Sequence, residues 1–394
     1  MGIYCIFGGL NVLYYHDMSF ALLKTSPNSA ARLGLLKTDH GDIPTPIFMP
    51  VGTAASVKAV SPRDLVEMKA KIILANTYHL HLRPGTPLIA KMGGIHKFCS
   101  WQGPVLTDSG GFQVWSLKEL RKIRENGVEF RSHLDGSKHF FSPESVMQAQ
   151  REIGADIIMA FDECTPYPST IEQTQKSLDY TKRWTRTAKE WLSKNPPLHG
   201  YGQKFFGIIQ GGTHEELRLQ AIEELKQIEP DGYAIGGLSV GESAEEMYKI
   251  SALCTQQIPE THPRYIMGVG TPWNILELIL RGVDMFDCVM PTRNARNGML
   301  FTSKGVLHYK SAIHKESEAP PDENCSCYTC KNFSKAYLRH LIHSNELLVL
   351  QLASIHNLHF YLNLMEQARE KISQGCFEEW AGEQIKCLNQ NLQN

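Results

Sequence analysis

Two aspartates stand in apolar segments where a carboxylate is unexpected. Asp287 lies within MFDCVM, residues 285–290, and Asp108 lies near the end of PVLTDS, residues 104–109. If the fold brings them together, one carboxylate could attack an anomeric carbon while the other donates and accepts the proton of the leaving group. Two carboxylates can also hold a metal ion. The pair therefore predicts chemistry on a sugar, with metal binding as the alternative.

A third acid, Asp162, lies in MAFDECTPYP, residues 159–168. A carboxylate can accept hydrogen bonds from an N–H and an adjacent amino group, the pair that the Watson–Crick edge of guanine presents. Gln210 and a backbone N–H of residues 236–238 could bind the guanine carbonyl. Residues 108–112 supply glycines for close approach and a phenylalanine that could stack on a base. These features are suggestive of a purine site.

Two arginines follow Asp287 in the same segment, at positions 293 and 296. Arginine binds phosphate groups well, so the segment could hold an acid and a nucleic-acid contact side by side. The whole chain has a formal net charge of −1, which is unlike a protein coated in positive charge. Any nucleic-acid contact must therefore be local.

Three cysteines, Cys325, Cys327 and Cys330, form a C-x-C-x-x-C set without a fourth cysteine close by. A tetrahedral zinc site would need one histidine from further along the chain. Four strong ligands leave no open position for water, so such a metal would fold its surroundings and not catalyse. Spacing alone does not choose the histidine. The candidates are His340, His343, His356 and His359.

Eight short apolar runs of strand character could position these residues, and helix start signals lie between several of them, as at Ser142, Thr213 and Ser243. Such runs, separated by helices, favour a parallel (β/α)₈ barrel, because strands covered on both faces lose the polar alternation of an exposed sheet. An open doubly wound sheet is the alternative. The predicted strands are residues 47–51, 71–76, 104–109, 155–162, 204–209, 233–238, 264–269 and 285–290.

Polar and glycine residues gather at the carboxyl ends of these predicted strands. That end is the face on which a parallel barrel builds its site, so we expect these residues to converge there. They are Asp108, Asp162, Gln210, Gly237 with Leu238, Met267 with Gly268, and Asp287.

The remaining segments suggest the domain organisation. We expect residues 1–17 to be an N-terminal extension, with Met18 as an alternative start, residues 18–310 to form the barrel, and residues 311–394 to form a helical zinc-binding subdomain packed on it. Residues 331–343 are predicted to form one amphipathic helix with a basic stripe. No run of eighteen apolar residues and no secretory signal is found, which favours a cytoplasmic location.

Several longer motifs can now be read in order along the chain. They are TDSGGFQV (107–114), MAFDECTPYP (159–168), IIQGG (208–212), GGLSVGE (236–242), YIMGVGTP (265–272), DMFDCVMPTRNARNG (284–298), and CSCYTC with IHNL (355–358). In this order they resemble the bacterial tRNA-guanine transglycosylases over roughly residues 30–365. That resemblance implies an irregular (β/α)₈ barrel with a zinc subdomain, a homodimer, and replacement of guanine at the anticodon wobble position of tRNA by a 7-deazaguanine base.

The resemblance also implies a role for each matching position. Asp287 matches the nucleophile on ribose C1′, Asp108 the general acid/base, and His356 the fourth zinc ligand. The positions implied in base binding are Asp108, Ser109, Gly110, Gly111, Phe112, Asp162, Cys164, Gln210, Gly236, Gly237, Leu238, Val240 and Met267. Those implied in tRNA contact are Gly268, Val269, Gly270, Thr271, Pro272, Trp273, Asn274, Thr292, Arg293, Asn294, Ala295 and Arg296.

The incoming base is the open choice within this family. Cys164 and Val240 are of the bacterial type, which favours 7-aminomethyl-7-deazaguanine (preQ1), whereas a larger pocket would favour queuine. Other readings are a relative that modifies the tRNA D-loop, a non-catalytic tRNA-binding partner subunit, and a glycoside hydrolase. The chain is too short for a relative that modifies the D-loop. A non-catalytic partner subunit would not use the paired acids, and a glycoside hydrolase would not use the zinc cluster.

Overall fold

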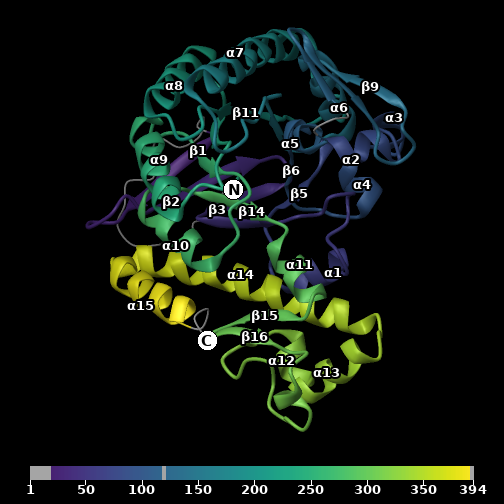
Figure 1. The fold of residues 1–394 in the computed structure, drawn as a ribbon, viewed down its shortest axis with the longest axis vertical. Coiled ribbons are helices and arrows are strands. Elements are labelled where there is room, and N and C mark those ends of the chain that lie inside the picture. Colours follow the sequence, from purple (N-terminus) through teal and green to yellow (C-terminus); the bar gives the residue numbers. More distant parts are fainter. Residues whose placement is uncertain (1–18, 118–120, 391–394) are drawn as a thin grey trace, which may run out of the picture.

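The computed structural model describes residues 19–117 and 121–390, so the predicted extension 1–17 lies outside the described residues. Eight parallel strands form one sheet in the order β4, β14, β13, β12, β11, β10, β6, β5, and a parallel bridge between Val51 and Leu74 joins the two outer strands. The sheet therefore closes into the predicted barrel, which excludes an open sheet (Figure 1). The strands are β4 Ile47–Pro50, β5 Ile73–Ala75, β6 Val105–Thr107, β10 Ile157–Met159, β11 Lys204–Ile209, β12 Gly232–Ile235, β13 Arg264–Ile266 and β14 Met285–Cys288.

All eight predicted strands exist, but most are shorter than the apolar runs that predicted them. The run 155–162 contains only β10, which ends at Met159, three residues before Asp162. Asp108, Asp162 and Gln210 follow the last residues of their strands and line a cavity at the carboxyl end of the barrel, whereas Asp287 lies within β14 and pairs with Met49.

Helices surround the barrel. Those predicted after Ser142 and Ser243 begin at the next residue, and the one predicted after Thr213 begins two residues later, at Glu215. α6 begins after Ser142, whose hydroxyl accepts a hydrogen bond from the amide of Ser145, and its buried face includes Val146, Ala149 and Ile153. The surrounding helices are α1 Pro62–Glu67, α2 Thr77–Leu82, α3 Thr86–Lys91, α4 Ile95–Cys99, α5 Gly111–Ser116, α6 Pro143–Ile153, α7 Ile171–Lys194, α8 Glu215–Ile228, α9 Ala244–Gln257 and α10 Pro272–Leu280.

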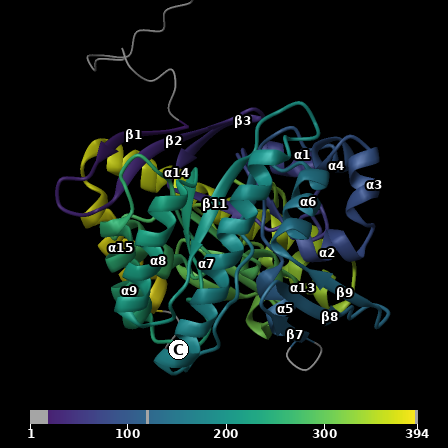
Figure 2. The same cartoon turned by 90° about the horizontal axis from the view of Figure 1, so that it is seen from above.

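Two three-stranded antiparallel sheets, which the sequence did not predict, are added to the barrel. β1 Phe20–Thr25, β2 Arg32–Thr38 and β3 Gly41–Thr45 form the first, which lies along one edge of the molecule in Figure 2. Phe20, Leu36 and Ile43 from this sheet pack in one cluster with the residues inside the barrel. The sheet therefore closes one end of the barrel. The second sheet consists of β7 Arg121–Arg124, β8 Gly127–Arg131 and β9 Lys138–Phe141.

The C-terminal part is built around α14 Leu348–Gln374, which runs between the barrel and the segments beyond it (Figure 1). Its Tyr361 hydroxyl donates to the carbonyl of Gly270, and its Arg369 donates to the carbonyl of Pro46 at 2.6 Å. The helix is therefore bonded directly to the barrel. The other elements that follow the barrel strands are α11 Met290–Arg296, β15 Met299–Thr302, β16 Gly305–His308, the 3-10 helix η2 Ala312–His314, α12 Tyr328–Asn332, α13 Lys335–His343 and α15 Phe377–Gln390.

The single basic helix predicted over residues 331–343 is wrong. The chain is extended at Phe333, and Ser334 starts a new helix, because its hydroxyl accepts a hydrogen bond from the amide of Tyr337. Lys331 therefore lies on α12, while Lys335 and the rest of the basic stripe lie on α13. Among the described residues, no helix is long and apolar enough to cross a membrane.

Candidate active site and metal centre

A cavity of about 490 Å³ opens at the carboxyl ends of the barrel strands. Asp287 and Asp108 both line it, so the two acids that are 179 positions apart in the sequence meet in one site, as predicted. Of the predicted base-binding positions, all but Gly111 line the same cavity. Gly111 lies directly behind them, where a Cβ would come within 2.7 Å of the Asp162 carboxylate.

Asp287 is held through one oxygen only. Oδ1 accepts hydrogen bonds from the Tyr265 hydroxyl at 2.6 Å and from the Gly268 amide at 2.9 Å. No described residue donates to Oδ2. Burial raises the pKa of Asp287, and these two bonds oppose the rise without cancelling it. The carboxylate is therefore oriented with one oxygen left for a ligand.

Asp108 is held by three donors in a buried position. Its oxygens accept hydrogen bonds from the Asn76 amide group, from the Thr77 backbone N–H at 2.9 Å and from the Gly110 N–H at 3.2 Å. Burial raises the pKa of Asp108 to about 6; the bonds from Asn76 and Thr77 lower it, and the charge of Asp287 adds to the rise. A carboxyl with a pKa close to neutral can both give and take a proton, which is what a general acid/base needs.

The third acid is paired with the predicted amide. Asp162 accepts a hydrogen bond from Gln210 Nε2 at 2.7 Å and one from the Ser109 hydroxyl at 2.9 Å, and burial raises its pKa. An amide nitrogen carries two N–H groups, so Gln210 keeps one donor for a ligand. Burial also raises the pKa of the Cys164 thiol, which therefore stays neutral and forms an apolar part of the wall.

Two glycines are required where the predicted base-binding loop passes Gln210. A Cβ at Gly237, whose φ is +63°, would come within 2.4 Å of Gln210 Oε1, and one at Gly236 would come within 2.9 Å of its Nε2. The guanidinium of the buried Arg218 holds this loop by donating to the Gly236 carbonyl at 2.7 Å. The backbone amides of the next residues, Ser239 and Val240, donate to the Glu242 carboxylate.

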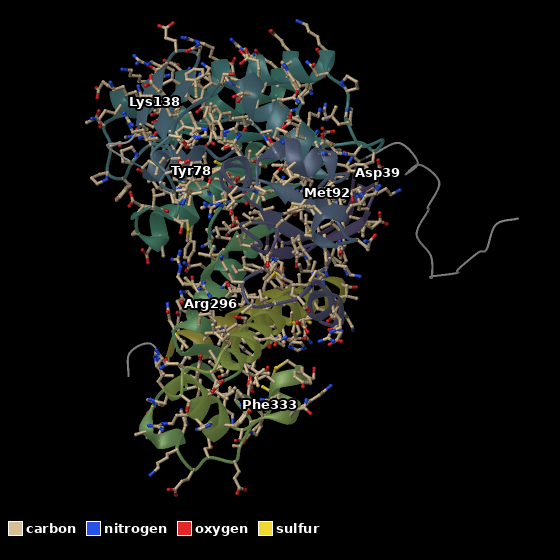
Figure 3. The ribbon with its side chains drawn as sticks, turned by 90° about the vertical axis from the view of Figure 1, so that its right-hand side faces the viewer. Asp39, Tyr78, Met92, Lys138, Arg296 and Phe333 are labelled. Atoms are coloured by element: carbon tan, nitrogen blue, oxygen red, sulfur yellow. The ribbon has the colours of Figure 1, made fainter. Side chains whose placement is uncertain are left out.

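The predicted tRNA-contacting residues are divided between surface and interior. Gly268 and the exposed Arg293 line the active-site cavity, whereas Arg296 borders a separate cavity of about 510 Å³ together with Lys310 and His343. Figure 3 shows Arg296 where the barrel meets the C-terminal part. Asn274 accepts a hydrogen bond from the Tyr248 hydroxyl at 2.6 Å. The side chains of Val269, Pro272, Thr292 and Ala295 are buried, so they support the loops from beneath.

Sequence reasoning missed three side chains that hold the site in place. Asn76 ends the predicted strand 71–76, so the rule that found Asp108 and Asp162 could have found it. Tyr265 lies inside a strand and Arg218 inside a helix, and neither stands at the strand ends where functional side chains were expected. Only their three-dimensional contacts reveal them.

The cysteine cluster is completed by one histidine. The ligand atoms of Cys325, Cys327, Cys330 and His356 all lie within 4.8 Å of one another, and His356 Nδ1 is 3.2 Å from Cys330 Sγ. His356 Nε2 lies 2.8 Å from the Phe301 carbonyl, which can only accept, so Nε2 carries the proton and Nδ1 offers its lone pair. The group can therefore hold a tetrahedral metal ion.

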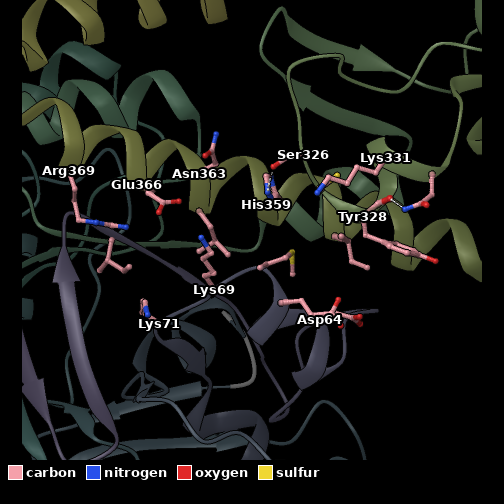
Figure 4. Close-up of a pocket in the computed structure, with 17 residues that line it drawn as sticks. Asp64, Lys69, Lys71, Ser326, Tyr328, Lys331, His359, Asn363, Glu366 and Arg369 are labelled. Carbon is pink, nitrogen blue, oxygen red and sulfur yellow. Dashed lines mark hydrogen bonds between the residues drawn. The ribbon is translucent and has the colours of Figure 1, made fainter.

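A further cavity, of about 580 Å³, lies beside this cluster, between the α1 region and α14 (Figure 4). Cys327 is part of its wall, and Lys69, Lys71 and Arg369 add positive charge to it. Neither Asp108 nor Asp287 borders it. The groups suited to chemistry on a sugar therefore lie only in the barrel cavity among the cavities described.

The chain is similar to several bacterial proteins. A family model described as Queuine tRNA-ribosyltransferase matches residues 27–389. A queuine tRNA-ribosyltransferase of Thermoanaerobacter sp. (strain X514) is 54% identical over 357 residues, which is 91% of this chain and 94% of that relative. Relatives with the same description from Halothermothrix orenii and Francisella tularensis subsp. novicida are 53% and 52% identical, and the matches cover 98% of each relative.

These matches run through the barrel strands, both acids of the cavity and the cysteine cluster, and they agree with the motifs that suggested the resemblance. The described structure supplies the barrel fold that the motifs predicted. The chain therefore belongs to the queuine tRNA-ribosyltransferase family of tRNA-modifying pentosyltransferases.

Proposed function

We propose that this chain exchanges guanine at the anticodon wobble position of tRNAs with GUN anticodons, those for Asp, Asn, His and Tyr, for preQ1 in queuosine biosynthesis. The observation that carries the proposal is the arrangement of Asp287, which has one oxygen free, and Asp108 in one cavity whose wall presents Asp162 and Gln210. The target nucleotide must leave the anticodon stack to enter the cavity.

Two displacements at one carbon would accomplish the exchange. Asp287 Oδ2 attacks ribose C1′, the C1′–N9 bond breaks with its electron pair going to guanine, and Asp108 protonates the departing base. The incoming base then loses its proton to Asp108 and attacks C1′, and the bond to Asp287 breaks. Each attack inverts the carbon, so the configuration is retained overall. The proposal includes a covalent bond between enzyme and RNA.

Other features of the enzyme are proposed on the same basis. We propose one structural Zn²⁺ per subunit at the cysteine cluster, because three thiolates and one imidazole are the ligand set that tetrahedral zinc prefers. A homodimer, a cytoplasmic location, and a boundary near residue 310 between the catalytic barrel and the zinc-binding subdomain complete the proposal. Arg293 and Arg296 are proposed to bind the RNA strand on either side of the target.

A base-exchange assay tests the function. With tRNA bearing a GUN anticodon, labelled guanine should enter the tRNA, preQ1 should compete with it strongly, and queuine weakly. Asp162→Asn should weaken base binding by about 100-fold. The carboxylate can accept hydrogen bonds from two N–H donors of the base, whereas the asparagine side chain has only one acceptor oxygen and places an NH₂ group opposite the second donor. An exchange that prefers queuine over preQ1 would reassign the substrate, and no exchange at all would remove the proposal.

The pH dependence of the first displacement tests the role of Asp108. If Asp108 must be protonated to release guanine, formation of the covalent complex in a single turnover should fall about tenfold per pH unit above pH 6. Asn76→Ala removes a donor that stabilises the carboxylate, so it should raise the pKa of Asp108 and move this fall to higher pH. A rate that does not change between pH 5 and pH 8 would contradict the assignment.

A further inference from the structure

A second group of metal-binding side chains lies at the end of the barrel opposite the active site. Among the described residues, two groups of three or more histidines, cysteines and acids have their ligand atoms within 4.8 Å of one another: the cysteine cluster, and the set His40, His96 and Asp156. Asp156 directly precedes β10, His40 lies in the turn between β2 and β3, and His96 lies on α4. We call these three residues the amino-end histidine cluster.

The carboxylate of Asp156 is the centre of the amino-end histidine cluster. Its side chain is fully buried, and its Oδ1 lies 2.7 Å from His40 Nδ1. Its Oδ2 accepts a hydrogen bond from the Val105 amide at 2.8 Å and lies 3.2 Å from His96 Nε2. A buried carboxylate needs positive charge nearby, and both imidazoles face it.

His96 presents an unshared nitrogen to this carboxylate. Its other ring nitrogen, Nδ1, lies 3.3 Å from the carbonyl of Trp101, which can only accept, so the proton of a neutral ring belongs on Nδ1. The Nε2 atom is buried and has no hydrogen-bond partner among the described residues. A lone pair on Nε2 and an oxygen of Asp156 therefore face each other at 3.2 Å, which is unfavourable unless a cation lies between them.

The separation of these two groups also fits a shared metal ion. Nε2 and Oδ2 are close enough for a hydrogen bond but are not aligned for one. An ion that bonds to both atoms at about 2.0 to 2.1 Å would not lie on the line from Nε2 to Oδ2. The direction from Nε2 to the ion would make an angle of about 40° with that line, so the lone pair of Nε2 should not be directed straight at the oxygen. A hydrogen bond from a second ring nitrogen to a backbone carbonyl, as His96 makes to Trp101, is also usual for a metal-binding histidine.

His40 would supply the third ligand and the route of entry. Its ring stacks on that of His96 with the centroids 3.6 Å apart, and 21% of its side chain is exposed. Two ligands of one tetrahedral ion lie about 3.3 Å apart, so binding would lengthen the 2.7 Å contact between His40 and Asp156 and replace its hydrogen bond. Binding would also tilt the His40 ring out of its stack on His96, because the two rings are nearly parallel and each nitrogen lone pair lies in the plane of its ring.

We propose that His40, His96 and Asp156 bind a divalent transition-metal ion, with Zn²⁺ as the expected ion because two imidazoles and a carboxylate suit it. The ion would join the β2–β3 turn to α4 and to the start of β10. Its place at the amino end of the strands, away from Asp287, indicates a role in stability, and its fourth position would be open to water. This site is separate from the cysteine cluster and does not depend on the proposed function.

Metal content under controlled zinc tests the proposal. The full-length protein, dialysed against about 10 μM free Zn²⁺, should hold two ions per chain. His40→Gln and His40→Arg should each hold one, because the loss of a ligand should weaken binding by more than the roughly 100-fold that outer-shell changes alone can cause. Arginine keeps a positive charge next to Asp156 but offers no lone pair to a metal. The melting temperature should rise on adding Zn²⁺ for the wild type and not for either variant.

His199→Gln is the matched control. His199 lies at the same end of the barrel and bonds to the carbonyl of Glu152, not to Asp156, so this variant should keep two ions. One ion per chain in the wild type would overturn the proposal and assign the contact to a protonated His96. Two ions in His40→Gln and in His40→Arg would overturn it as well, because the second ion would then lie elsewhere.

Discussion

Asp287→Ala should abolish base exchange, with a loss of at least about 10⁴-fold in rate, because no other carboxylate of the cavity has an oxygen free to bond C1′. Binding of tRNA should survive nearly unchanged, since Asp287 bonds to Tyr265 and Gly268 and carries no positive charge for phosphate. The measurements are incorporation of labelled guanine, and tRNA affinity in the absence of a free base.

Covalent trapping makes this test sharper. Wild-type enzyme mixed with labelled tRNA and denatured should carry RNA on the protein, and Asp287→Ala should carry none. Asp179→Ala, an aspartate exposed on α7, is the matched control and should behave as wild type. If Asp287→Ala exchanged bases at a rate near that of the wild type, another residue would be the nucleophile and the double displacement through Asp287 would be wrong.

Loss of the metal at the cysteine cluster should have the largest effect on folding. Binding of structural zinc contributes on the order of 10 kcal/mol or more, which is comparable with the whole stability of a typical domain. His356→Ala removes the ligand that joins α14 to the cysteines, so it should lower the melting temperature by more than about 10 °C. Chelation of the wild-type protein should lower the melting temperature by at least as much, because it also removes the ion proposed at His40, His96 and Asp156.

His359 provides the control on the same helix. It lies one turn beyond His356, and its Nδ1 is 3.6 Å from Cys325 Sγ, but it is not part of the four-ligand group. His359→Ala should therefore keep the metal and melt within about 2 °C of the wild type. Exchange with Co²⁺ reports on this site alone, because thiolate-to-cobalt absorption requires the cysteines; if His356→Ala kept that absorption and His359→Ala lost it, the fourth ligand would be His359.

Much of the barrel was predictable because its signals are local. Strands buried on both faces must be apolar along their whole length, so eight such runs separated by helices indicated the closed parallel sheet that the structure shows. The polar residues at their ends had to meet, because the carboxyl ends of parallel strands lie at one face. The sheet of β1 to β3 was missed, because the sequence of these strands has no hydrophobic pattern that sets it apart from a loop.

The break at Ser334 shows where periodicity misleads. The basic residues recur every four positions from Lys331 to His343, as they would on one helix, but the serine cap begins a second helix. A repeat of charges does not record whether the backbone between them is continuous. The hydrogen bond from the Tyr337 amide to the Ser334 hydroxyl decided that a second helix begins here.

The sequence by itself determined which chemistry is available: acids at strand ends, three cysteines closely spaced, and glycines where a ligand or a side chain must come close. The tertiary structure decided which atoms are free to act. Tyr265 and Gly268 donate hydrogen bonds to Oδ1 of Asp287, and no described residue donates to Oδ2. The carbonyl of Phe301 bonds to Nε2 of His356, so Nδ1 is the nitrogen left for the metal at the cysteines. These choices depend on contacts between residues far apart in the chain, and hydrogen bonds of that kind leave no pattern in the spacing of the residues that form them.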